Sequence, residues 1–182
     1  MKLIRNRYFA AAVMAVLILA AVLLGSHRSL SGLRSRAAET FYAGVAGDNL
    51  SIGNDLRDRV EYAYSLATVA ARYLEGTDAQ LTALREAAAA LEQAPSPSAK
   101  AAANSRLTTA AAAVYDALGH YSLSETDARY RQSLYADLNA RNDTIGRDGY
   151  NAVAQAFNDQ LQAFPASLLA PLTGVAPLEL FR

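Results

Sequence analysis

The sequence predicts an all-α protein, in which an N-terminal transmembrane helix is followed by an elongated up-down antiparallel bundle of about four helices. An uncharged apolar run lies near the N-terminus, and beyond it apolar residues recur every three or four positions, as on one face of a helix. No long stretch shows the alternation of a strand. Many of the hydrophobic residues are alanines, so we expect helices that pack closely through small side chains.

Residues 8–25 form the predicted transmembrane helix, preceded by a short basic N-terminus, residues 1–7. The uncharged run would rise about 26 Å as a helix, slightly less than a hydrocarbon core of about 30 Å. A cleaved secretory signal is the alternative, but no small-x-small site follows the run directly. We therefore expect an uncleaved, single-pass anchor in the cell membrane. Equal numbers of basic residues flank it, so the side of the bundle is left open.

The charge distribution separates the N-terminal region from the rest of the chain. Residues 1–36 carry six basic groups and no acid, whereas the remaining chain carries 11 basic and 17 acidic groups, a net charge of −6. A negatively charged domain without a basic stripe binds phosphates poorly, so we expect no nucleic-acid partner. The basic connector, residues 26–48, is either a solvated spacer or a contact for lipid headgroups, and Gly44 and Gly47 are its expected hinge.

Capping residues mark the helices of the predicted bundle, residues 49–165. The first helix is expected over 49–75, ending at Gly76. The second opens at the capping box Thr77-x-x-Gln80. The third is expected to begin with Ser96 as N-cap and Pro97 in the first turn and to end at Gly119, and the fourth to begin at the capping box Ser122-x-x-Glu125 and run to Phe164.

The predicted fourth helix carries acid–base pairs four residues apart, which favour an exposed helix. The pairs are Glu125–Arg129, Asp127–Arg131, Asp137–Arg141 and Asp143–Arg147. As one continuous helix the segment would be about 60 Å long. Because glycine costs up to about 1 kcal/mol relative to alanine inside a helix, we expect a kink at Gly146 and Gly149.

One segment has a specific signature. Tyr150, Phe157 and Phe164 recur every seven residues and predict an apolar seam, beside a polar stripe made of Arg147, Asn151, Gln155, Asn158 and Gln162. The pattern Arg147-x-x-Tyr150-Asn151, then Asn158, then Phe164-Pro165 and a hydrophobic tail, resembles the C-terminal signature of the LemA family. The resemblance extends over about residues 50–175, with weaker matches at Arg59, Glu61, Leu66 and Tyr73.

The resemblance implies a divergent member of that family, because Tyr64-Ser65 replaces the usual Pro-Asn of the first helix. It also implies a transmembrane helix followed by a helical domain, without an agreed activity. The residues of the signature have two interpretations. They either lock the last helix against the first, with asparagine amides satisfying buried polar groups, or they form a surface for a partner or for self-assembly.

Residue types that carry catalysis are scarce. The chain has no cysteine and only two histidines, His27 and His120, and it lacks phosphate-loop, dinucleotide and nucleophile-elbow motifs. Acids at Asp55, Asp58 and Glu61 alternate with arginines, which favours a charged outer surface. We therefore expect no catalytic residues, no metal ligands, no cofactor and no enzymatic activity.

The C-terminal tail, residues 166–182, is apolar without a clear period, which is typical of an interface. It folds back over the bundle, contacts the membrane or holds a partner, and of these we favour the first. The sequence as a whole favours a membrane-anchored, non-catalytic scaffold or assembly module, with the lipid bilayer as one partner and a protein or a second copy as another. The alternatives are a membrane-tethered ligand-sensing or signalling input domain and a secreted helical protein.

Overall fold

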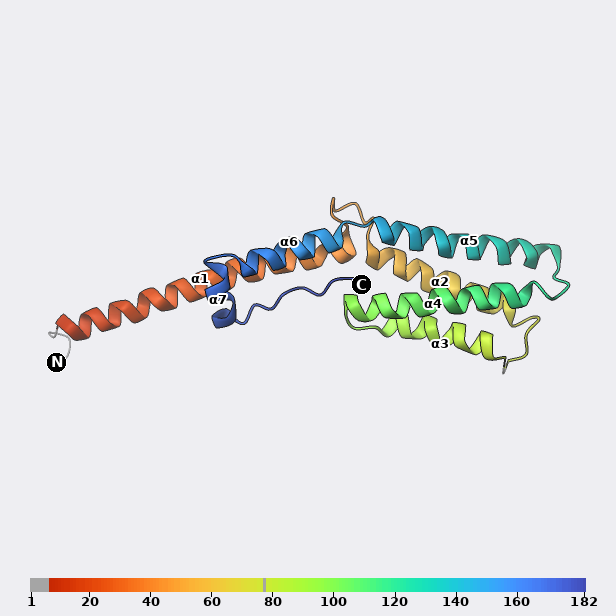
Figure 1. Cartoon of the computed structure of the whole chain (residues 1–182), viewed down its shortest axis with the longest axis horizontal. Helices are drawn as coiled ribbons and strands as arrows, with labels where there is room; N and C mark the ends of the chain where they lie inside the picture. Colours follow the sequence, from red (N-terminus) through yellow and green to blue (C-terminus); the bar gives the residue numbers. More distant parts are fainter. Residues whose placement is uncertain (1–6, 77) are drawn as a thin grey trace. The chain divides into compact units, whose positions relative to one another are not determined.

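The computed structural model describes residues 7–76 and 78–182, which contain helices and no strand. The elements are α1 (Arg7–Ala43), α2 (Ile52–Ala70), α3 (Ala79–Gln93), α4 (Pro97–Leu118), α5 (Glu125–Arg147), α6 (Tyr150–Gln162) and α7 (Ala166–Thr173) (Figure 1). The chain divides into two compact units. Unit 1 contains the chain up to Ala38 together with Ala154–Leu178, and unit 2 contains Glu39–Val153 and Glu179–Arg182.

Unit 2 is an up-down bundle of α2, α3, α4 and α5, which confirms the predicted all-α fold (Figure 1). Helix α2 packs against the other three, and α3 and α4 form a second close pair. Leucines and alanines make up most of the core, and the fully buried ones include Leu66, Leu84, Leu107, Ala63 and Ala88. Alanine lets helix backbones approach closely, while leucine supplies most of the apolar area removed from water.

The cap of α4 confirms the sequence prediction. Ser96 has extended backbone, its hydroxyl accepts from the Ala99 N–H, and Pro97 occupies the first turn. Gly119 caps the C-terminus of the same helix, also as predicted.

Two other helix starts were predicted at the wrong residue. Asp78 caps α3, its carboxylate accepting from the N–H groups of Gln80 and Leu81, and Thr77 lies outside the described residues. Ser124, not Ser122, caps α5 by accepting from the Asp127 N–H. In both cases a second capping residue lies within two positions of the predicted one, and the spacing of the apolar face does not resolve so small a difference.

The predicted fourth helix is divided into α5 and α6, which confirms the expected interruption near Gly146 and Gly149. Asp148 has extended backbone, and its carboxylate accepts from the Tyr150 N–H at 2.7 Å, starting α6. A Cβ on Gly149 would lie 3.0 Å from Cγ2 of Val45, so a glycine suits the close approach there. Helix α6 ends at Gln162, two residues before the predicted end.

Helix α1 continues through most of the predicted connector and ends at Ala43. Gly44 and Gly47 follow in the left-handed region, with φ values of 79° and 70°, and make a tight turn where a hinge was expected. In unit 1 the connector also contacts protein. The His27 ring lies 2.9 Å from the Thr173 carbonyl oxygen, and Arg34 Nε donates to the Ala176 carbonyl oxygen at 2.9 Å. The side chains of His27 and Arg34 therefore contact backbone carbonyl groups within unit 1.

Candidate functional site

In unit 2, the asparagine of the signature holds the end of the chain by its backbone. Asn151 Nδ2 donates to the Phe181 carbonyl oxygen at 2.9 Å, and Asn151 Oδ1 accepts from the Phe181 N–H at 2.8 Å. One amide thus binds both polar atoms of one residue, as a neighbouring strand would. The Asn151 amide therefore binds extended backbone, whatever side chain the bound residue carries.

Further contacts complete what we call the C-terminal seat, formed by Phe41, Ser98, Tyr150 and Asn151 of unit 2. The Tyr150 hydroxyl donates to the Glu179 carbonyl oxygen at 2.7 Å, and the Ser98 hydroxyl donates to the Glu179 carboxylate at 2.5 Å. That hydrogen bond, with help from Ser96, lowers the pKa of Glu179. The Phe41 ring makes edge contact with Tyr150 at 5.0 Å between centroids and lies 6.1 Å from Phe181.

In unit 1, the second asparagine of the signature makes the same kind of contact. Asn158 Nδ2 donates to the Leu178 carbonyl oxygen at 2.9 Å, and Asn158 Oδ1 accepts from the Leu178 N–H at 2.7 Å. Leu178 itself is buried. Asn151 and Asn158 are seven residues apart on α6, which is two helical turns. One interpretation of the signature had these amides satisfying buried polar groups while they lock the last helix against the first; the groups that both amides bind here are backbone groups of the tail.

The remaining residues of the signature behave differently. Tyr150 and Phe157 are buried, as the predicted apolar seam requires, but Phe164 is 82% exposed and does not extend it. The prediction fails there because α6 ends at Gln162, so the helical repeat no longer applies at Phe164. Pro165 lies between α6 and α7, consistent with its expected role as a helix stop. Arg147 is exposed and lies at the edge of a cavity of about 280 Å³.

Arg59 is buried in the bundle, which corrects the prediction of a charged outer surface. It is 1% exposed, its Nη1 donates to the Leu138 carbonyl oxygen, and its Nη2 donates to Thr108 Oγ1 at 2.7 Å. No carboxylate is among these partners, and Arg59 Nε and Asn104 Oδ1 are both buried without a hydrogen bond. Burial lowers the pKa of Arg59 to about 10, so the guanidinium stays charged at neutral pH.

Asp127 is also buried, so the predicted surface pair with Arg131 is wrong. The carboxylate accepts from the Tyr73 hydroxyl at 2.6 Å, from the Ser124 hydroxyl at 2.9 Å and from Arg72 at 2.5 Å. These bonds, that from Tyr73 first, lower the pKa of Asp127. The family match at Tyr73 therefore has a structural role, because its hydroxyl joins the turn after α2 to the first turn of α5.

A third polar cluster joins α2 to α5. Arg141 pairs with Asp55 and Asp58, each at 3.1 Å, and burial raises the pKa of Asp55. The sequence predicts a pair of Arg141 with Asp137 and a surface position for Asp55, whereas in the structure Arg141 pairs with Asp55, which is buried. The residues at the other two weak family matches differ in burial: Leu66 lies in the core, whereas Glu61 is exposed.

The spacing of α2 could have revealed its buried polar residues. Asp55 and Arg59 each follow an apolar core residue, Ile52 or Leu56, by three positions, and therefore lie on the apolar face. The alternation of arginines with acids favoured a surface interpretation because charged residues are rarely buried.

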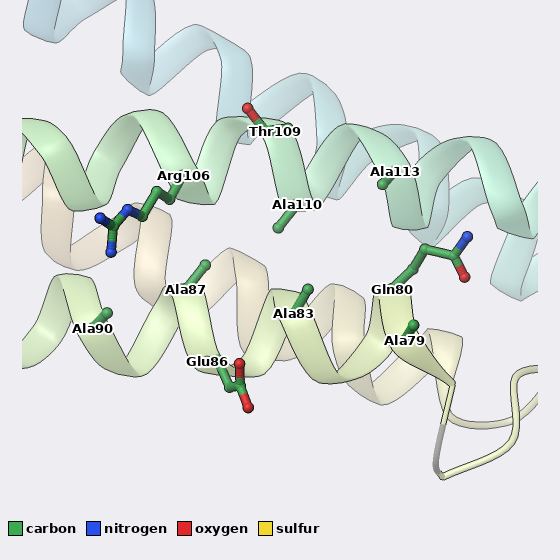
Figure 2. A pocket seen from close by; sticks show the side chains of 10 residues that line it. All are labelled: Ala79, Gln80, Ala83, Glu86, Ala87, Ala90, Arg106, Thr109, Ala110 and Ala113. Atoms are coloured by element: carbon green, nitrogen blue, oxygen red, sulfur yellow. The ribbon is translucent and has the colours of Figure 1, made fainter.

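An open groove of about 730 Å³ runs between α3 and α4. Figure 2 shows Ala83 and Ala87 of α3 facing Ala110 of α4, with the longer Gln80 and Arg106 at the sides. The groove exists because alanine side chains leave the space between the helices unfilled. Neither Asn151 nor Asn158 is among the residues that line it.

In the part of the chain that the structure describes, side chains of the types that bind metal ions do not cluster. Within residues 7–76 and 78–182, no three His, Asp or Glu side chains gather closely enough to hold a metal ion.

The fold and the signature define the class of this protein as an all-helical bundle preceded by a helix that is long and apolar enough to cross a membrane. The family model described as LemA family matches residues 49–182, which is most of the chain. The chain therefore belongs to the LemA family. No curated protein and no solved structure matches it.

Proposed function

We propose that this LemA family protein is a non-catalytic scaffold or assembly module anchored in the cell membrane by α1. The observation that carries the proposal is the exposed apolar surface of that helix. Between Tyr8 and Leu24 its large apolar side chains point outward, and Leu17, Ile18 and Leu19 are each more than half exposed. Such a surface is unfavourable in water and is the surface expected to contact lipid.

The arrangement of the signature supports a non-catalytic role. Catalysis needs polar side chains that converge on a space where a substrate can bind. Asn151 and Asn158 instead use both polar atoms of their amides on backbone groups of the tail. The buried Asp127 is likewise occupied by three donors within the bundle.

The groove between α3 and α4 supports interaction with another protein. It is open and lined mainly by alanine, with polar groups on Gln80, Glu86, Arg106 and Thr109, and the Thr109 hydroxyl already donates to the Ser105 carbonyl oxygen. A shallow apolar groove of this kind suits a helix or an apolar side chain of a partner. A ligand-sensing domain, the alternative, would need several polar groups converging between the helices.

Membrane anchoring is tested by extraction. Leu17→Arg places a charge at the centre of the apolar run, which costs about 2.5–3.5 kcal/mol in membrane insertion. We expect the wild-type chain to stay with membranes after an alkaline carbonate wash and the variant to be lost from them. Leu50→Arg is the matched control, because Leu50 is equally exposed but lies in the loop before α2. Extraction of the wild-type chain, or a mature N-terminus beyond Leu24, would refute the anchor.

The scaffold role is tested by crosslinking in intact membranes and identification of the captured proteins. Ala83→Arg fills the groove between α3 and α4, whereas Ala102→Arg changes an exposed alanine of α4 outside it. We expect a reproducible partner that is lost with Ala83→Arg and kept with Ala102→Arg. Capture of monomer alone would count against a scaffold.

A further inference from the structure

The C-terminal seat binds its occupant mainly through backbone atoms. Three of its hydrogen bonds go to the N–H of Phe181 and to the carbonyl oxygens of Phe181 and Glu179. Side chains of the tail are used in the hydrogen bonds of the Glu179 carboxylate with Ser98 and Ser96 and in the ring contact of Phe181 with Phe41. The seat is thus built for an extended peptide with an acidic residue two positions before an aromatic one.

The present occupant is only partly buried. Glu179 and Arg182 are exposed, and Leu180 and Phe181 are only half-buried. No helix follows Gly174, which has a φ of 71°, so the segment before the seat has no helical hydrogen bonds to break. Release of this tetrapeptide breaks the four hydrogen bonds of the seat, each of which contributes only modestly to net stability because water replaces the lost partner.

We propose that the C-terminal seat also receives the C-terminal segment of a second copy of this chain, so that two copies exchange their last residues. A second copy is the occupant that the structure specifies, because its tail carries the same Glu179 and Phe181 that already fit the seat. Exchange of identical elements is a low-cost route to a dimer, since every contact of the monomer is remade. The inference deepens the proposed assembly role and rests on it.

Anchoring strengthens the exchange. Within one chain, the tail is favoured by its high effective concentration near its own seat. Copies held in one membrane are also concentrated relative to one another, which raises the rate at which a released tail meets the seat of a neighbour. The exchange therefore depends on the density of the protein in the membrane.

The absence of cysteine from the chain allows a direct test. Full-length chains with Ser98→Cys and Glu179→Cys carry different tags, are mixed in vesicles of phosphatidylcholine and phosphatidylglycerol, and are treated with a short bismaleimide. We expect a crosslinked product that contains both tags. Both substitutions remove the same side-chain contact but leave the three backbone hydrogen bonds of the seat in place.

Two controls identify the seat as the cause. Adding Asn151→Ala to the Ser98→Cys chain should lower the yield of the doubly tagged product about tenfold, whereas Gln155→Ala should leave it unchanged, because Gln155 bonds to Asp159 and not to the tail. Thr109→Cys, exposed on the same helix as Ser98, should give no such product with Glu179→Cys.

A chain that carries both cysteines shows whether the seat is occupied at all. If this chain crosslinks internally while the mixed chains give no product with both tags, exchange between copies is refuted. Failure of both reactions also refutes it, because the seat would then be empty in membranes. Partner capture through the groove between α3 and α4 is unaffected by either result, so the proposed scaffold role is judged separately.

Discussion

Replacing Arg59 with methionine tests how the buried cation affects the stability of the bundle. The lowered pKa of Arg59 corresponds to roughly 3 kcal/mol against its charged form in the folded state. Its Nε has no hydrogen-bond partner, so that part of the desolvation is not offset. Against these costs stand two hydrogen bonds from a charged donor, to Leu138 and Thr108, which contribute about 1.5–3 kcal/mol each. The opposing contributions nearly cancel.

Methionine should therefore be tolerated. The Leu138 carbonyl lies inside α5, where the helix provides another donor, and the Thr108 hydroxyl donates to the Asn104 carbonyl oxygen at 3.0 Å. Neither acceptor is left without a partner, and methionine fills much of the vacated volume. We expect the free energy of unfolding of Arg59→Met to lie within about 1 kcal/mol of the wild-type value or above it.

Arg59→Ala is the matched comparison, because it removes the same charge but leaves a cavity. We expect it to lower the free energy of unfolding by about 2–4 kcal/mol. The measurement is urea unfolding of the full-length chain in mild detergent, followed by the helical signal in far-ultraviolet circular dichroism. If Arg59→Met were as destabilising as Arg59→Ala, the guanidinium hydrogen bonds would outweigh its burial, and the reasoning would be wrong.

Three further perturbations test other parts of the structure. Because the pKa of Asp127 is lowered in the folded state, the stability that its carboxylate provides is present at neutral pH and is lost as the pH falls through that lowered value. Asp127→Asn should therefore flatten the acid limb of a plot of unfolding free energy against pH. An unchanged acid limb would contradict this. Gly44→Ala should cost about 1–3 kcal/mol in the same urea assay, because its Cβ would lie 2.5 Å from the Leu50 carbonyl oxygen, and Gly47→Ala should cost less, because nothing lies within 4 Å there. Asn158→Ala should speed hydrogen exchange at the Leu178 amide about tenfold, and equal exchange in both proteins would show that this contact does not hold the tail.

The sequence predicted the elements of the bundle better than the environment of its charged residues. Helices with alanine- and leucine-rich faces were recognisable from spacing, and Ser96 with Pro97 located the start of α4 correctly. Arg59 and Asp127 were misplaced because a charged residue is buried only when partners from other helices satisfy it, and those partners are distant in sequence.

The candidate site was predicted in part. Tyr150, Asn151 and Asn158 were singled out from the signature, and their spacing placed them correctly along one helix. Their partners could not be predicted, because an amide that binds backbone leaves no requirement on the residue type it contacts. Phe181 and Leu178 therefore carry no pattern that pairs them with Asn151 and Asn158.

The anchoring of the last residues has a practical consequence for anyone who labels this protein. An affinity tag or fluorescent reporter fused after Arg182 lengthens a segment whose backbone is already engaged at Phe181. Such a fusion would compete with the hydrogen bonds between Asn151 and Phe181, so the label would report on a protein whose C-terminus is loosened. A label placed in the exposed turn at His120 leaves those contacts intact.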